Sequence, residues 1–213
     1  MRPDTCTGHD RDTPATVTAF ETHPTSIDGL RVVQTKQVVD ERGAVREIYR
    51  ESVFASSGDG SLAAPRQVNL TSTCRGAIRG LHGEAMTKLV GVVAGRGFGA
   101  YLDVRTDSAS RGTLLTLTLE PGRQVLVPNG VCNGFQALSD GCLYLYCFDA
   151  EWVSGMPGVA VNPLDPDLAI AWPIPVDKAD RALVSEKDAA LPNLADIARE
   201  QASGAVRLER ETR

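Results

Sequence analysis

Apolar and polar residues alternate in short runs along most of the chain from residue 29 to residue 148. Residues 115–119, for example, alternate strictly between Leu and Thr. A period of two is typical of β-strands that bury one face, so each run predicts a short strand. The predicted strands are residues 30–39, 46–50, 67–71, 87–93, 98–104, 115–119, 124–127, 134–138 and 142–148.

Turns that contain glycine or proline separate these predicted strands. Residues 40–43 and the pair Pro121-Gly122 are interpreted as turns. The run Ala94-Gly95-Arg96-Gly97 predicts a β-hairpin between the strands on either side of it. Many short strands with such turns indicate an all-β sandwich or a jelly-roll barrel, and a small barrel can hold one ligand in its mouth.

The two ends of the chain differ from this middle part. Residues 1–25 are polar and lack periodicity, so we expect a disordered N-terminal extension. Residues 26–175 are the expected barrel domain, and residues 176–213 are a C-terminal segment. Within that segment, residues 196–202 predict a short surface helix and residues 207–213 predict a charged tail.

Composition and charge exclude several classes of protein. A hydrophobic content of 42%, a charged content of 23% and a net charge of −5 are ordinary for a soluble domain and argue against nucleic-acid binding. No apolar run is long enough to span a bilayer, and the N-terminus lacks the apolar core of a signal peptide. We therefore expect a cytoplasmic protein that binds neither nucleic acid nor membrane.

The five cysteines are odd in number and irregular in spacing, so they do not indicate a disulfide framework. Cys142 and Cys147 lie in apolar strand sequence and are interpreted as small buried residues. Cys132 adjoins a candidate site position, which leaves a nucleophilic role open, although no histidine adjoins it in sequence to lower its pKa.

The residues around His82 resemble the two sequence motifs of cupins, which are jelly-roll barrels. In order, the residues at the motif positions are Gly76, His82, Glu84, Lys88, Gly95, Gly122, Pro128, Gly130 and Asn133. A metal-binding cupin uses three His and a Glu, whereas Lys88 and Asn133 replace two ligands here. Because an ammonium group cannot ligate a transition metal, we expect a metal-free cupin with a fixed positive charge near the place of the ion.

A series of short sequence runs makes the resemblance more specific than that to cupins in general. In order they are Gln67-Val68-Asn69, Arg79-Gly80-Leu81-His82, Lys88-Leu89-Val90, Asp103-Val104-Arg105, Pro128-Asn129-Gly130, Leu145-Tyr146, Asp165-Pro166-Asp167-Leu168, Ala171-Trp172-Pro173 and Ser185-Glu186-Lys187-Asp188. Each run alone is a weak signal, but their order is specific. Over residues 29–196 the chain resembles the dTDP-4-dehydrorhamnose 3,5-epimerase family.

The resemblance implies an epimerase that inverts C3, C5 or both in a nucleotide-linked 4-keto-6-deoxy sugar, without metal or other cofactor. A proton next to a ketone is too weakly acidic for an imidazole alone, so the site must also stabilise an enolate. By resemblance, the catalytic residues are the base His82, its orienting partner Asp188, Lys88 near the C4 oxygen, and the proton donor Tyr146. Tyr144 has the same strand parity as Tyr146 and is the alternative donor.

The resemblance also implies a homodimer, whose N-terminal strands cross between subunits, and a set of substrate-binding residues. These are Arg42, Glu47, Gln67, Asn69, Arg79, Asn133, Trp152 and Lys187. The chain departs from the family at Asn133, where many members have a second His, at Val45, where an aromatic residue is frequent, and at Trp152, where Tyr is usual. The segment between His82 and Lys88 is also shorter. The nucleotide and the inverted carbon therefore stay open.

Two other functions stay open at this point. A ketoisomerase would move the ketone between carbons by the same enolate chemistry, and NMR of the product would distinguish it. A non-catalytic cupin would only bind the sugar nucleotide, and entry of solvent deuterium into the substrate would exclude it.

Overall fold

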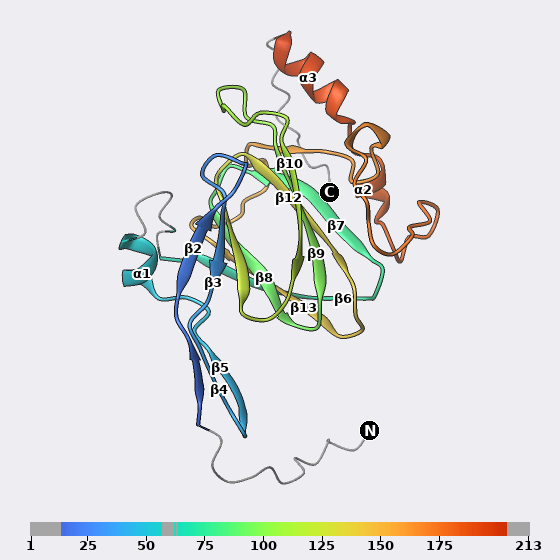
Figure 1. The fold of residues 1–213 in the computed structure, drawn as a ribbon. Helices are drawn as coiled ribbons and strands as arrows, with labels where there is room; N and C mark the ends of the chain where they lie inside the picture. The colour runs from blue at the N-terminus through green and yellow to red at the C-terminus, as the bar shows by residue number, and fades with distance from the viewer. Residues whose placement is uncertain (1–13, 57–61, 63, 204–213) are drawn as a thin grey trace.

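Two antiparallel sheets form the body of the protein in a computed structural model, which describes residues 14–56, 62 and 64–203 (Figure 1). In spatial order, the six-stranded sheet contains β2 (Glu21–Pro24), β3 (Arg31–Gln34), β11 (Arg123–Val127), β8 (Lys88–Ala94), β13 (Cys142–Phe148) and β6 (Gln67–Thr73). The five-stranded sheet contains β10 (Leu114–Leu119), β9 (Gly97–Asp103), β12 (Val131–Ala137), β7 (Ile78–Glu84) and β14 (Gly158–Ala160). The expected all-β jelly roll is confirmed.

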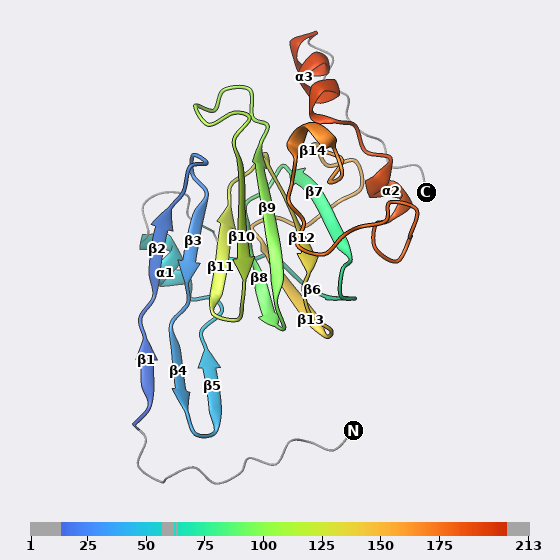
Figure 2. The same ribbon diagram turned by 45° about the vertical axis from the view of Figure 1, so that its right-hand side comes forward.

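A separate three-stranded sheet extends away from the barrel (Figures 1 and 2). It contains β1 (Thr16–Thr18), β4 (Gln37–Asp40) and β5 (Gly43–Arg46) in the order β1-β4-β5. The prediction of one strand over residues 30–39 is therefore wrong, because β3 and β4 belong to different sheets. Thr35 lies at the break, where its backbone N–H donates to the Gly122 carbonyl at 2.9 Å. The predicted strand at residues 46–50 also differs, because β5 ends at Arg46.

Strand structure begins before the boundary expected at residue 25. Within residues 14–25, β1 pairs with β4 and β2 pairs with β3. Apolar residues in such a polar segment are few, so periodicity gave no signal for these strands. Residues 1–13 and the predicted tail at residues 207–213 lie outside the described residues.

The chain crosses from one sheet to the other between β8 and β9, so the predicted hairpin at residues 94–97 is wrong. β8 pairs with β11 and β13, whereas β9 pairs with β10 and β12. Gly95 makes the turn with a φ of 79°, a conformation that favours glycine. Val90 on β8 and Tyr101 on β9 then face one core from opposite sides. Alternation predicts two strands here, but it does not say which strands pair.

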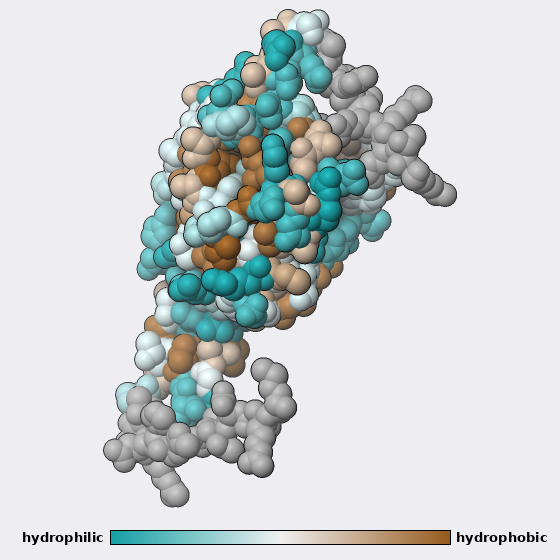
Figure 3. All heavy atoms as spheres, turned by 90° about the vertical axis from the view of Figure 1, so that its right-hand side faces the viewer, coloured by the Kyte–Doolittle hydropathy of each residue, from teal (hydrophilic) through white to brown (hydrophobic). Residues whose placement is uncertain are grey.

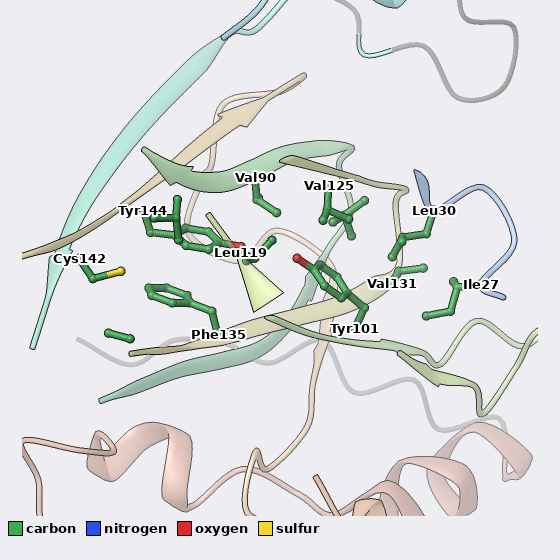
Figure 4. Packing of buried hydrophobic residues seen from close by; sticks show 13 residues of the cluster. Ile27, Leu30, Val90, Tyr101, Leu119, Val125, Val131, Phe135, Cys142 and Tyr144 are labelled. Atoms are coloured by element: carbon green, nitrogen blue, oxygen red, sulfur yellow. The ribbon is translucent and has the colours of Figure 1, made fainter. Parts of the chain in front are cut away.

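The core lies between the two sheets (Figure 4). Phe135 on β12 and Tyr144 on β13 stack across it, with ring centroids 3.9 Å apart. Full burial of one large apolar side chain is worth about 1.5–3 kcal/mol, so this cluster contributes strongly to the stability of the barrel. Its buried members are Ile27, Leu30, Val90, Val92, Tyr101, Leu119, Val125, Val127, Val131, Phe135, Ala137, Cys142 and Tyr144.

Short helices cover the outside of the barrel. α1 (Glu51–Ser56) packs Phe54 against the outer face of the six-stranded sheet, and α3 (Leu194–Ala202) packs Ile197 on the five-stranded sheet. A 3-10 turn (Pro166–Leu168) and α2 (Glu186–Ala189) precede α3. The predicted helix at residues 196–202 is confirmed, and it begins two residues earlier, after Asn193. Among the described residues, no helix is long and apolar enough to cross a membrane.

Candidate active site

A cavity of about 500 Å³ opens beside β6, β7, β13 and the segment before α2. Its walls carry both apolar surface and polar groups, which is typical of a small-molecule site. The predicted site residues that line it are Gln67, Asn69, Arg79, His82, Tyr146, Trp152 and Asp188. Residues that are far apart in the sequence therefore meet in one cavity.

His82 and Asp188 form a hydrogen-bonded pair in the wall of this cavity. Nε2 of His82 lies 2.9 Å from Oδ1 of Asp188. The histidine side chain is 39% exposed, whereas the aspartate is buried. The imidazole can thus contact a ligand in the cavity, while its hydrogen bond to the buried carboxylate fixes its orientation.

Asp188 is held in position by α2 and by its neighbours. Ser185 caps this helix, because its Oγ accepts from the Asp188 backbone N–H at 3.0 Å. Burial acts to raise the pKa of Asp188, but hydrogen bonds from His82, the Gly80 amide and Ser185 hold that pKa below its usual value. The carboxylate is therefore ionised at neutral pH and accepts from Nε2–H of His82, which leaves Nδ1 as the free imidazole nitrogen.

A smaller recess of about 40 Å³ adjoins the main cavity and shares His82 and Tyr146 with it. Lys88 and Asn133 line this recess, so both predicted residues lie at the inner end of the site. Lys88 is only 2% exposed, and its Nζ donates to the His82 carbonyl at 3.0 Å and to the Glu84 carboxylate. The ammonium group of Lys88 thus lies against the backbone carbonyl of His82, at the inner end of the site.

The pair Lys88–Glu84 places a charge and its counter-charge inside the barrel. Burial acts to raise the pKa of Glu84, but the charge and hydrogen bond of Lys88 hold it below its usual value. The described residues contain no group of three or more His, Cys, Asp or Glu side chains that could hold a metal ion.

Tyr146 reaches the cavity and Tyr144 does not. Both face inward on β13, with ring centroids 4.8 Å apart. Tyr144 is fully buried in the core, whereas Tyr146 lines both the cavity and the recess. Burial raises the pKa of Tyr146 well above its usual value, although the charge of Arg79 acts in the opposite direction. Tyr146 therefore carries its proton at neutral pH and can donate it.

Close approach of two strands shapes the backbone beside His82. Gly80 on β7 and Gly134 on β12 face each other, and a Cβ at Gly80 would lie 2.5 Å from Gly134 Cα. Gly80 also has a φ of 118°. The register of the pair shifts between Asn133 and Phe135. Glycine is thus required at this position, and the irregular pairing sets His82 and Asn133 side by side at the inner end of the site.

Three predicted substrate-binding residues lie outside the cavity of the single chain. Arg42 forms an ion pair with Asp40 near the tip of the β4–β5 hairpin, and Glu47 pairs with Arg50 just beyond β5. Lys187 is exposed on α2, next to Asp188. Their role in binding stays a prediction.

Sequence reasoning missed several residues that line the cavity. Arg181 and Phe148 are among them, and Cys74 is an exposed thiol in the same wall. Arg181 stands four residues before Ser185, so the run that identified Asp188 could have indicated it. Cys132, in contrast, lines neither space, and burial raises its pKa to about 12, so the structure does not support it as a nucleophile.

Comparisons with known proteins agree with this geometry. Residues 24–196 match the dTDP-4-dehydrorhamnose 3,5-epimerase family. The dTDP-4-dehydrorhamnose 3,5-epimerase of Methanothermobacter thermautotrophicus is 34% identical over 173 residues, which cover 77% of this chain and 89% of that protein.

Solved structures of sugar epimerases have the same fold. NovW, a 4-keto-6-deoxy sugar epimerase from the novobiocin biosynthetic gene cluster of Streptomyces spheroides, matches with a TM-score of 0.79 and 27% identity, over 92% of this chain and 96% of NovW. ChmJ, a 3'-monoepimerase from Streptomyces bikiniensis in complex with dTDP-quinovose, matches with a TM-score of 0.75 and 28% identity, over 88% and 100% of the two chains. Sequence and fold agree over the barrel and over the helix that carries Asp188, so this chain belongs to the dTDP-4-dehydrorhamnose 3,5-epimerase family.

Proposed function

We propose that this protein epimerises a dTDP-linked 4-keto-6-deoxy sugar at C3, C5 or both. The observation that carries the proposal is the arrangement of His82, Asp188 and Tyr146 in one cavity. His82 belongs to β7 in the five-stranded sheet, and Tyr146 belongs to β13 in the six-stranded sheet. A sugar ring between the two sheets has the base on one face and the acid on the other, which is the requirement for inversion.

His82 is the base. The ionised Asp188 accepts from Nε2–H, so Nδ1 removes the proton from the carbon next to the ketone. The electron pair of the broken C–H bond forms the C=C bond of an enolate, and the carbonyl electrons move to the C4 oxygen. Asp188 then stabilises the imidazolium that forms.

Lys88 stabilises the enolate oxygen. An ammonium group has three N–H donors, and the His82 carbonyl and Glu84 use two of them. The third donor is available for the C4 oxygen in the recess. A charged donor inside the barrel is worth more than one in water, because little solvent screens it.

Tyr146 completes the inversion. Its hydroxyl donates a proton to the enolate carbon on the face opposite His82, the C4 ketone reforms, and a new C–H bond replaces the broken one. Solvent then returns a proton to the phenolate and takes one from the imidazolium, so no redox cofactor is consumed.

The outer part of the cavity fits the nucleotide diphosphate. Arg79 and Arg181 line the wall, and guanidinium groups bind diphosphate oxygens in pairs of hydrogen bonds. Trp152, which is 45% exposed at the same wall, offers an aromatic face on which the nucleobase of the substrate can stack. The relative ChmJ has dTDP-quinovose in its structure, which supports a dTDP-sugar as the substrate.

The protruding sheet supports a homodimer. Arg42 and Glu47 lie outside the cavity of their own chain, while Val17 and Val45 are exposed on this sheet. Figure 3 shows apolar side chains on the narrow part of the molecule that carries it. A second copy would cover this apolar surface and receive Arg42 and Glu47 at its own cavity.

Solvent exchange tests the proposed reaction. The protein is incubated with dTDP-4-keto-6-deoxyglucose in D₂O, and NMR follows deuterium and configuration at C3 and C5. We expect deuterium and inversion at one or both carbons, and we expect His82→Ala to lose both. His23→Ala is the matched control, because His23 is an exposed histidine on β2 and should keep full activity. Exchange that survives in His82→Ala, or a wild-type protein that gives no exchange, would refute the proposal.

Hybrid dimers test the shared site. His82→Ala and a double variant with Arg42→Ala and Glu47→Ala are co-expressed with different affinity tags, and the hybrid is purified by both tags. If each site uses residues from both chains, one site of the hybrid carries all the defects and the other is intact, so activity returns to about half of the wild-type value. A hybrid as inactive as its parents, or a monomer in solution, would contradict the homodimer.

A further inference from the structure

Asn133 is a buried amide without a partner at the inner end of the site. It is 4% exposed, and no hydrogen bond among the described residues engages its Oδ1. It lies directly opposite His82 in the pairing of β12 with β7, and it lines the recess together with Lys88. Buried polar groups are almost always paired, so an unpaired amide beside a catalytic base indicates a task in the reaction.

The NH₂ end of this amide is the end that the recess can reach. The protein encloses the oxygen end, and the amide otherwise makes no hydrogen bond among the described residues. Lys88 presents its third N–H to the same recess, because the His82 carbonyl and Glu84 take the other two. Two donors therefore converge on a space that adjoins the base and is large enough for one oxygen atom.

We propose that Asn133 is a catalytic residue that donates a hydrogen bond to the C4 oxygen and, with Lys88, forms an oxyanion site. This inference rests on the proposed epimerase function and extends it. Two fixed donors match an oxygen that changes from a ketone to an enolate, because they bind it more strongly as its negative charge grows. Their positions also agree with that of His82, because C4, which carries this oxygen, is bonded to the carbon from which His82 removes the proton.

The amide differs from a histidine at this position in one respect. An amide does not titrate, so it donates equally at every pH, whereas an imidazole changes between donor and acceptor. Among the described residues, His82 is then the single imidazole of the cavity. The site thus separates its two tasks, with the imidazole of His82 for the proton and the amide of Asn133 with the ammonium of Lys88 for the oxygen.

Two substitutions test whether a donor is needed. Asn133→Leu removes both polar ends at similar size, and Asn133→Asp keeps the shape but removes the donors. We expect each to lower kcat for deuterium exchange by about a hundredfold, the usual effect of losing one oxyanion donor. Binding of dTDP-quinovose, which has no ketone, should change far less. Cys132→Ala is the control, because Cys132 is the neighbouring residue on β12 and lines neither space.

A spectroscopic readout separates this inference from the epimerase proposal. In a His82→Ala background, the substrate labelled with ¹³C at C4 binds without turnover, and its carbonyl resonance reports hydrogen bonding to the oxygen. We expect a downfield shift on binding that is smaller when Asn133→Leu or Asn133→Asp is added, whether or not the wild-type protein epimerises. The inference would be overturned by an unchanged kcat in both variants or by wild-type behaviour of Asn133→Asp. A carbonyl chemical shift that is the same with and without the substitution at residue 133 would also overturn it. Equal losses in binding and kcat would overturn it too, since they indicate a packing role.

Discussion

Asp188 and His82 are 106 residues apart in the sequence, and their side chains meet at 2.9 Å. The carboxylate comes from a four-residue helix outside the barrel, while the imidazole comes from a strand of the barrel wall. The position of His82, the proposed base, therefore depends on how the C-terminal segment docks on β7.

We expect Asp188→Asn to lower kcat by about 10²- to 10⁴-fold, because an amide neither fixes the imidazole tautomer nor stabilises its cation. KM should change little, and the loss should be smaller than in His82→Ala, which has no base at all. Steady-state kinetics on the three proteins measure this. Glu186→Gln is the control, since Glu186 is an exposed acid on the same helix. Normal kcat in Asp188→Asn would remove Asp188 from the mechanism.

Tyr146→Phe should separate exchange from inversion. Without the phenol, His82 still forms the enolate and returns a solvent-derived proton to the original face. The variant should therefore incorporate deuterium next to the ketone at a rate within about tenfold of the wild type, while the epimer forms about 10²- to 10⁴-fold more slowly. NMR in D₂O follows both signals in one sample.

Tyr144→Phe is the matched control for that measurement. Its ring stays in the core, and its hydroxyl has no hydrogen-bond partner among the described residues. We expect full epimerisation and unchanged or slightly raised thermal stability. Equal loss of exchange and inversion in Tyr146→Phe would instead indicate a role in binding or in enolate stabilisation.

Asp103 should make the fold sensitive to acid. Its buried carboxylate accepts from Arg105 Nε at 2.9 Å and from the Oγ atoms of Ser108 and Ser110. Burial acts to raise the pKa of Asp103, but these donors hold it well below its ordinary value of 3.8. Asp103 therefore takes up a proton at higher pH in the unfolded state than in the folded state. Its contribution to the free energy of unfolding is complete above about pH 5 and is lost as the pH falls further.

Thermal unfolding at several pH values measures the effect. At pH 7, Asp103→Asn should be about 2–3 kcal/mol less stable than the wild type. That difference should become smaller from pH 5 to pH 3. Asp107→Asn is the control, because Asp107 is exposed in the same loop and its substitution should change the free energy of unfolding little. A difference that stays constant over this range would contradict the assignment.

Cys74 offers a chemical probe of the cavity. It is exposed and lines the cavity, whereas Cys132, Cys142 and Cys147 are buried. We expect N-ethylmaleimide to modify Cys74 and to inhibit turnover. At a dTDP concentration ten times its Kd, modification should be about tenfold slower, since only the free protein reacts. Mass spectrometry of the Cys74 peptide measures the rate, and Cys74→Ser should resist inhibition. Protection by ATP equal to that by dTDP would indicate unspecific binding.

The barrel and the inner half of the site could be predicted from the sequence, because both depend on local patterns. Alternation identifies strands, and the ordered series of short runs assigns Lys88 and Tyr146 by resemblance to the family. The turn at Gly95 shows the limit of such patterns. A short turn between two alternating runs is compatible with a hairpin and with a crossing between sheets, and distant partner strands decide between them.

The outer half of the site depends on contacts that no local pattern contains. Arg181 lies in an irregular segment that contacts β7, where the Ile78 backbone N–H donates to the Leu183 carbonyl at 2.7 Å, and so it reaches the cavity. The break that divides residues 30–39 into β3 and β4 could not be predicted from the local sequence either. Its cause is the contact between Thr35 and Gly122, which are 87 residues apart.

The stack of Phe135 on Tyr144 joins the sheet that carries His82 to the sheet that carries Tyr146. These stacked rings act as a spacer between the two sheets. A slimmer pair of residues would let the sheets approach, and a bulkier pair would hold them apart. In the proposed mechanism, the separation of His82 and Tyr146 across the barrel therefore depends on two side chains that line neither the cavity nor the recess.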